Sequence, residues 1–154
     1  MIKKKANGRP AIILLAEDNP ADQQITKRVL RHVKVQTELH IVEDGVELMN
    51  YLRREDKYSD PKSSQRPDLI LLDINMPRMD GKKALRNIKG DSSLKAIPVV
   101  MLTTSNQDHD ILESYDIGVN SYITKPSDNN EFIKVIKSIE DFWLVVSELP
   151  SIDG

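Results

Sequence analysis

The sequence has no cysteine among its 154 residues, which excludes disulfide bonds, zinc–thiolate sites and a cysteine nucleophile. It also has no apolar run near the roughly 18 residues that a membrane-spanning helix needs. No large excess of charge is present either, since the net charge of −2 gives no general attraction for nucleic acid. We therefore expect a cytoplasmic protein, suited to a reducing compartment, with neither a membrane nor a nucleic-acid partner.

The length and composition fit one globular domain. A chain of 154 residues can bury a core without disulfides or metal staples, and 39% hydrophobic with 30% charged residues is an ordinary balance. The lysine-rich start is not followed by an apolar stretch long enough for a signal peptide. We expect residues 1–10 to be a flexible tail, residues 11–146 to form the domain and residues 147–154 to be a C-terminal tail.

Short apolar runs alternate with segments of helical periodicity along the chain. The expected strands are 11–16, 37–42, 68–73, 97–102 and 121–124, and the expected helices are 19 to about 33, 45–54, 81–89, 108–117 and 129–146. Continuous apolar runs are typical of strands covered on both faces, and the more polar second strand suits a sheet edge. This pattern predicts an α/β fold with a doubly wound, five-stranded parallel sheet.

Polar side chains stand at the ends of four of the expected strands. They are Glu17 and Asp18 after the first strand, Asp73 at the end of the third, Thr103 after the fourth and Lys125 after the fifth. Ligands of doubly wound sheets bind beyond the carboxyl ends of the strands. We therefore expect these side chains to lie together at one edge of the sheet.

The chemistry of this set points to a metal and a phosphate. Carboxylates placed together repel one another, and Mg²⁺ relieves the repulsion because it prefers oxygen ligands. An aspartate carboxylate can act as a nucleophile and form an aspartyl phosphate. Lys125 would offer a positive charge to a phosphate oxygen and Thr103 a hydroxyl donor. Taken singly, each residue would more often be a helix cap or a surface residue, but together they fit metal-assisted phosphoryl transfer.

At this point the chain strongly resembles the receiver domain of two-component response regulators, the CheY-like family. The resemblance is carried by Glu17-Asp18, the segment Leu72 to Gly81 (LDINMPRMDG), Thr103-Thr104-Ser105 and Lys125-Pro126. The spacing is also usual for that family: Thr103 lies thirty residues after Asp73, and Lys125 lies twenty-two after Thr103. The resemblance covers roughly residues 11–140. It implies the flavodoxin-like (βα)5 receiver fold.

The resemblance implies a metal-dependent phosphoacceptor site. Asp73 would accept phosphate from a phosphohistidine on a sensor histidine kinase. Asp18, Asp73 and the backbone carbonyl of Asn75 would bind Mg²⁺, and Glu17 would act through a metal-bound water. Lys125 would pair with the phosphate.

The resemblance also implies a switch. Thr103 would move toward the phosphate and let Tyr122 swing inward, although burial of Tyr122 at the sheet flank is the alternative. A cis peptide bond before Pro126 would hold Lys125 in place. Such a protein is not an enzyme acting on other molecules: it gains and loses its own phosphate. It would signal through altered contacts with an unknown downstream protein.

Two features resemble the stand-alone regulators of bacterial phytochrome histidine kinases. One is a polar surface loop at residues 55–67, and the other is the tail 139–150 with its consecutive apolar residues Phe142 to Val146. Those relatives lack an output domain and tend to dimerise through the last helix and its neighbours. A phytochrome-type kinase partner and a homodimer through the C-terminal helix are therefore hypotheses. Ordinary packing of that helix on its own sheet is the alternative.

Two other functions stay open. A pseudo-receiver would use the fold as a binding module without the phosphoryl chemistry. A haloacid-dehalogenase-like phosphatase also uses a strand-end aspartate, Mg²⁺, a hydroxyl residue and a lysine. That class normally needs a second aspartate two residues after the nucleophile, where this chain has Asn75, which cannot shuttle protons. Turnover of a small phosphoester would distinguish the phosphatase from the signalling protein.

Overall fold

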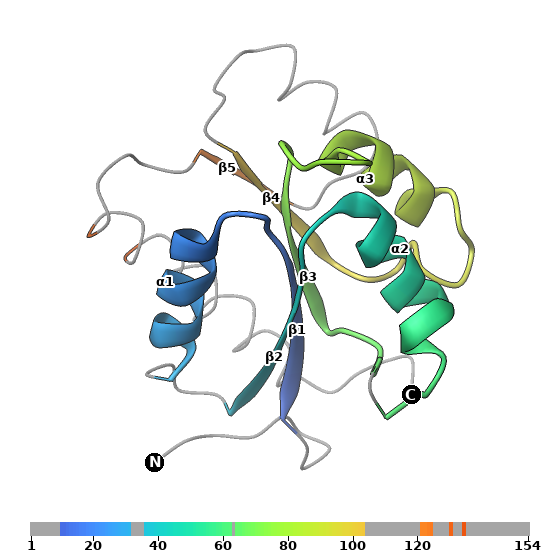
Figure 1. The fold of residues 1–154 in the computed structure, drawn as a ribbon, viewed down its shortest axis with the longest axis horizontal. Helices are drawn as coiled ribbons and strands as arrows, with labels where there is room; N and C mark the ends of the chain where they lie inside the picture. Colours follow the sequence, from blue (N-terminus) through green and yellow to red (C-terminus); the bar gives the residue numbers. More distant parts are fainter. Residues whose placement is uncertain are drawn as a thin grey trace.

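The computed structural model describes residues 10–31, 36–62, 64–103 and 121–124, together with Asn130 and Lys134. The strands are β1 (Ala11–Ala16), β2 (Thr37–Val42), β3 (Leu69–Asp73), β4 (Val99–Thr103) and β5 (Ser121–Thr124). The helices are α1 (Pro20–Leu30), α2 (Gly45–Arg53) and α3 (Gly81–Lys89), with a 3-10 turn, η1 (Asp56–Tyr58). The strands pair in parallel in the order β2-β1-β3-β4-β5 (Figure 1). The parallel α/β architecture predicted from the sequence is confirmed, and β2 lies at a sheet edge as expected.

Helices cover both faces of the sheet, with α1 on one side and α2 and α3 on the other (Figure 1). Side chains alternate between the two faces along each strand, so that Leu14 of β1 packs in the same hydrophobic cluster as Ile88 of α3. Its neighbour Ile13 packs in the opposite cluster with Ile25 of α1. Because both faces are covered, β1 is buried along its whole length, which explains its continuous apolar sequence.

Three side-chain caps start the helices that follow β1, β2 and β3. Asn19 caps α1, which begins at Pro20, by accepting a backbone N–H of the first turn at 2.9 Å. Asp80 caps α3 by accepting the N–H of Lys83 at 2.9 Å. Asp44 caps α2 in the same way, at 2.7 Å from the N–H of Glu47, and this cap was not predicted. Each cap thus fixes where its helix begins at the carboxyl edge of the sheet.

Strand boundaries differ from the prediction where one residue cannot join the ladder. β4 begins at Val99 rather than at residue 97, because Pro98 has no N–H to donate and lies just before the strand. It ends at Thr103, which is therefore the last strand residue rather than the first loop residue. β3 begins at Leu69, one residue later than predicted, although Asp68 still contacts β1: its backbone N–H donates to the carbonyl of Ile12 at 2.7 Å, and its carboxylate accepts the N–H of Ile12 at 2.8 Å.

Helix ends also correct the prediction. α2 ends at Arg53 because Arg54 adopts a left-handed conformation, with φ 55°. The segment predicted as loop contains the single turn η1. α3 ends before Gly90 as predicted, but Gly90 has φ −85°, so the left-handed freedom of glycine is not used there. α1 ends at Leu30, short of the predicted residue 33.

Some predictions lie outside the described residues. They are residues 1–9 of the N-terminal tail, the helix at 108–117, nearly all of the helix at 129–146, the C-terminal tail 147–154, Lys125 and the peptide bond before Pro126. The domain boundaries also stay predictions. Among the helices that the structure does describe, none has the length and apolar character needed to cross a membrane.

Candidate metal centre

Three carboxylates come together at the carboxyl ends of β1 and β3. One oxygen each from Glu17, Asp18 and Asp73 lies within 4.8 Å of the other two. The register brings them together, because Ala16 of β1 pairs with Leu72 of β3 immediately before the acidic residues. Glu17 is 1% exposed and Asp73 6%, whereas Asp18 is open to solvent. The three carboxylates that were expected at one edge of the sheet therefore lie together.

Contacts from α1 hold the Glu17 turn in place. The Glu17 carboxylate accepts the backbone N–H of Asn19 at 3.3 Å, and its backbone carbonyl accepts the side-chain amide of Gln23 at 2.6 Å. The backbone N–H of Glu17 donates to Val42 of β2 at 2.9 Å. This role of Gln23 was not predicted from the sequence. Its place in the first turn after the acidic pair was the only signal. The turn that presents Glu17 and Asp18 is thus fixed by two neighbouring elements.

The donor set of this cluster contains only carboxylate oxygens, which fits a hard divalent cation such as Mg²⁺ or Mn²⁺. Three negative charges held this close repel one another, and a bound cation compensates that repulsion. Exposed Asp18 also leaves room for water, which Mg²⁺ tends to retain. The residues present therefore fit a metal ion beside Asp73.

Two glycines allow the loop after β3 to pack closely. A β-carbon on Gly81 would lie 2.2 Å from the carbonyl oxygen of Asp73. The N–H of Gly81 donates to the carbonyl oxygen of Ile74 at 2.8 Å. A β-carbon on Gly45 would lie 2.3 Å from the carbonyl oxygen of Met79, to which the Gly45 N–H donates at 3.0 Å. Close backbone approach therefore requires glycine at both positions.

The backbone places Thr103 at the same edge and Tyr122 within the outer strand of that side of the sheet. Asp73 pairs with Leu102 of β4, so Thr103 stands one residue further toward the carboxyl edge. Tyr122 lies within β5, which pairs with β4. Lys125 follows the last residue of β5 and is outside the described residues. The topology thus agrees with the predicted positions of Thr103 and Tyr122, while their side-chain roles stay predictions.

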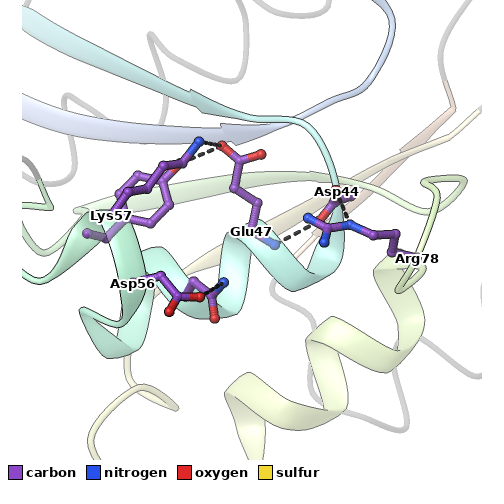
Figure 2. A network of polar contacts seen from close by, with 7 residues as sticks. Asp44, Glu47, Asp56, Lys57 and Arg78 are labelled. Atoms are coloured by element: carbon purple, nitrogen blue, oxygen red, sulfur yellow. Dashed lines mark hydrogen bonds and ion pairs between the residues drawn. The ribbon is translucent and has the colours of Figure 1, made fainter.

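An ion pair between the cap of α2 and the loop after β3 was missed by sequence reasoning (Figure 2). The Nε atom of Arg78 donates to Oδ2 of Asp44 at 2.8 Å. Burial raises the pKa of Asp44, but hydrogen bonds from Arg78 and from the Glu47 N–H outweigh it, so that pKa lies below its usual value. The same contact raises the pKa of Arg78. The two positions share no sequence pattern, because only the packing of α2 against the loop brings them together.

Comparison with known proteins places this geometry in a family. The family described as response regulator receiver domain matches residues 13–137. Response regulator Rcp1 of Synechocystis sp. is 42% identical over 142 residues, which is 92% of this chain and 95% of that protein.

Two solved structures resemble the whole fold. The phosphorylated cyanobacterial phytochrome response regulator RcpA superposes with a TM-score of 0.86 at 46% identity, covering 92% of this chain and 99% of that one. The Mn²⁺-bound form of Rcp1 gives a TM-score of 0.85 at 42% identity, covering 92% and 100%. The predicted resemblance to phytochrome response regulators is confirmed, and this chain belongs to the response regulator receiver domain family.

Proposed function

We propose that this chain accepts a phosphoryl group on Asp73 from a histidine kinase and signals through changed contacts with another protein. The supporting observation is the buried Asp73 carboxylate within 4.8 Å of the acidic pair Glu17 and Asp18. An oxygen of Asp73 would attack the phosphorus of a phosphohistidine while the phosphorus–nitrogen bond breaks and the histidine leaves. The chain would thus act on its own carboxylate rather than as an enzyme on other substrates.

Mg²⁺ is the metal we propose for this reaction, where it would neutralise charge on the phosphoryl oxygens. Asp18, Asp73 and the backbone carbonyl of Asn75 would hold it, and Glu17 would contact a metal-bound water. The oxygen-only donor set supports this assignment. The existence of a Mn²⁺-bound structure of the relative Rcp1 supports a divalent cation in general.

Phosphorylation would be read out on the β4–β5 side of the sheet. Lys125 would pair with a phosphate oxygen, and Thr103 would donate its hydroxyl to another. Movement of Thr103 would then let Tyr122 turn inward. The positions of Thr103 at the end of β4 and of Tyr122 in β5 support this proposal, because both strands end at the edge that carries Asp73.

The proposed partners are a histidine kinase of the phytochrome type and an unidentified downstream protein. The likeness to RcpA, a phytochrome response regulator, supports the kinase assignment. We also propose a cytoplasmic location, since a cysteine-free chain suits a reducing compartment.

A homodimer through the C-terminal helix is a further part of the proposal, motivated by the apolar run Phe142 to Val146. Analytical ultracentrifugation should show a dimer, and Trp143→Glu should shift it to monomer because a charge would be placed in an apolar contact. A wild-type protein that stays monomeric at high concentration, with and without phosphate, would remove this part of the proposal.

The experiment that tests the phosphoacceptor reaction is intact-mass measurement after incubation with acetyl phosphate. With Mg²⁺ present, the wild-type chain should gain one phosphate; with a chelator, the labelled fraction should fall by at least about tenfold, because the metal supplies charge stabilisation. An unlabelled wild type under both conditions would favour a pseudo-receiver. Steady release of product from a small phosphoester would favour the phosphatase.

A further inference from the structure

The loop between β3 and α3, residues 74–80, is tied to the start of α2 by two adjacent contacts. Arg78 donates from Nε to Oδ2 of Asp44 at 2.8 Å (Figure 2). The carbonyl of the next residue, Met79, accepts the N–H of Gly45 at 3.0 Å. The contacts therefore join consecutive residues of the loop to consecutive residues of α2 and its cap, which fixes both the position and the direction of the loop.

Arg78 occupies a backbone conformation that does not suit it. Its φ is 64°, in the left-handed region that glycine and asparagine adopt far more readily than arginine. Glycine would relieve that strain but could not reach Asp44. The arginine side chain is therefore the group that offsets an unfavourable backbone, through a hydrogen-bonded ion pair with a carboxylate whose side chain is only 10% exposed.

The anchor on α2 is itself held from two sides. Asp44 caps the helix through Oδ1, which accepts the N–H of Glu47 at 2.7 Å. The Glu47 carboxylate accepts the hydroxyl of Tyr58 and lies 3.3 Å from the ammonium of Lys57, both from η1 (Figure 2). The first turn of α2 is thus fixed by the β3–α3 loop on one side and by η1 on the other, so it can serve as a rigid support.

We propose that Asp44 and Arg78 are positioning residues for the metal site: their ion pair holds the β3–α3 loop in the conformation that presents the backbone of Asn75 to the cation. Asn75 lies three residues before Arg78 in the same short loop. This inference rests on the proposed function, because it concerns the metal ligand set proposed there. The ion pair would raise metal affinity by keeping the loop ready before the ion arrives.

Two conservative variants remove the ion pair but keep the local backbone conformation and the helix cap. Arg78→Asn removes the charge but tolerates the left-handed backbone, and Asp44→Asn removes the charge but still caps α2. Calorimetric titration with Mg²⁺ and Mn²⁺ should show about 3- to 10-fold weaker binding in each, below the roughly 10- to 100-fold typical of direct outer-sphere partners, because the pair is partly exposed. Arg78→Lys should restore part of the affinity.

Two readouts distinguish positioning from general destabilisation. Labelling by acetyl phosphate should be slower in both variants at low Mg²⁺ and should reach the wild-type rate at saturating Mg²⁺. In the metal-free protein, hydrogen exchange of the Gly45 N–H should become faster, because its acceptor Met79 is released. Arg53→Gln is the matched control: it removes another arginine–aspartate ion pair of α2, at 3.9 Å to Asp91, and should leave metal affinity unchanged.

The double variant completes the test. If the two residues act through one contact, combining Asp44→Asn with Arg78→Asn should weaken metal binding no more than either change alone. Wild-type affinity in Arg78→Asn, or additive losses in the double variant, would overturn the inference even if the wild type is phosphorylated normally. A wild type that binds metal with this dependence but takes up no phosphate would instead overturn the proposed function and leave the positioning role standing.

Discussion

The Asp73→Asn variant should take up no phosphate from acetyl phosphate or from a histidine kinase, while folding as the wild type does. An amide has nearly the size of a carboxylate but is not a nucleophile, so the covalent step is lost. The change also removes one of three negative charges that lie within 4.8 Å of one another. The free energy of unfolding should therefore be unchanged or higher, since repulsion in the cluster falls.

Intact mass and urea unfolding measure the two halves of this prediction. Asp18→Asn is the matched control, because it removes a charge from the same cluster but keeps the acceptor. That variant should still be labelled when Mg²⁺ is raised. Normal phosphate stoichiometry on Asp73→Asn would place the acceptor elsewhere in the chain and contradict the assignment.

Replacing Gly81 with alanine should lower the free energy of unfolding by about 1–3 kcal/mol or more, the range for overpacked sites. The added β-carbon would lie 2.2 Å from the carbonyl oxygen of Asp73 and 2.8 Å from the α-carbon of Ile74. Both are backbone atoms, so no side-chain rotation can relieve the clash. The end of β3 must shift, and we expect phosphorylation of Asp73 to slow together with the loss of stability.

Gly90→Ala is the matched control for that variant. A β-carbon there meets only the carbonyl oxygen of Arg86 at 3.1 Å, with the next atom at 4.0 Å, and φ is −85°. We expect the free energy of unfolding to change by less than about 1 kcal/mol, because alanine also reduces the freedom of the unfolded chain. Equal stability of the two variants in urea unfolding would show that the loop adapts to a side chain at position 81.

The fold was predictable because the burial of each strand is reflected in its local pattern of apolar and polar residues. The continuous apolar run of β1 and the polar pattern of β2 gave the bounds of these strands correctly. The errors arose where a single backbone group decides the boundary. Pro98 cannot donate to the ladder, and Arg54 turns left-handed, and neither effect changes the apolar pattern on which the prediction depended.

The acidic cluster was also predictable, since neighbouring parallel strands bring their carboxyl ends to one edge whatever the details of packing. The contacts that support the cluster were not predictable. The clash that reserves position 81 for glycine and the contact between Arg78 and Asp44 both depend on how the β3–α3 loop meets other elements. Arg78 and Asp44 are 34 positions apart in the sequence, and no periodicity marks either contact.

The two carboxylate oxygens of Asp44 have different partners: Oδ1 accepts the N–H of Glu47 in α2, and Oδ2 accepts a hydrogen bond from Arg78. Serine and threonine are also good helix caps, but each offers a single hydroxyl oxygen and no charge. An exchange of Asp44 for serine would therefore keep the secondary structure and release the loop. We therefore expect such an exchange to slow phosphorylation at low Mg²⁺ without any change among the residues proposed to perform the chemistry.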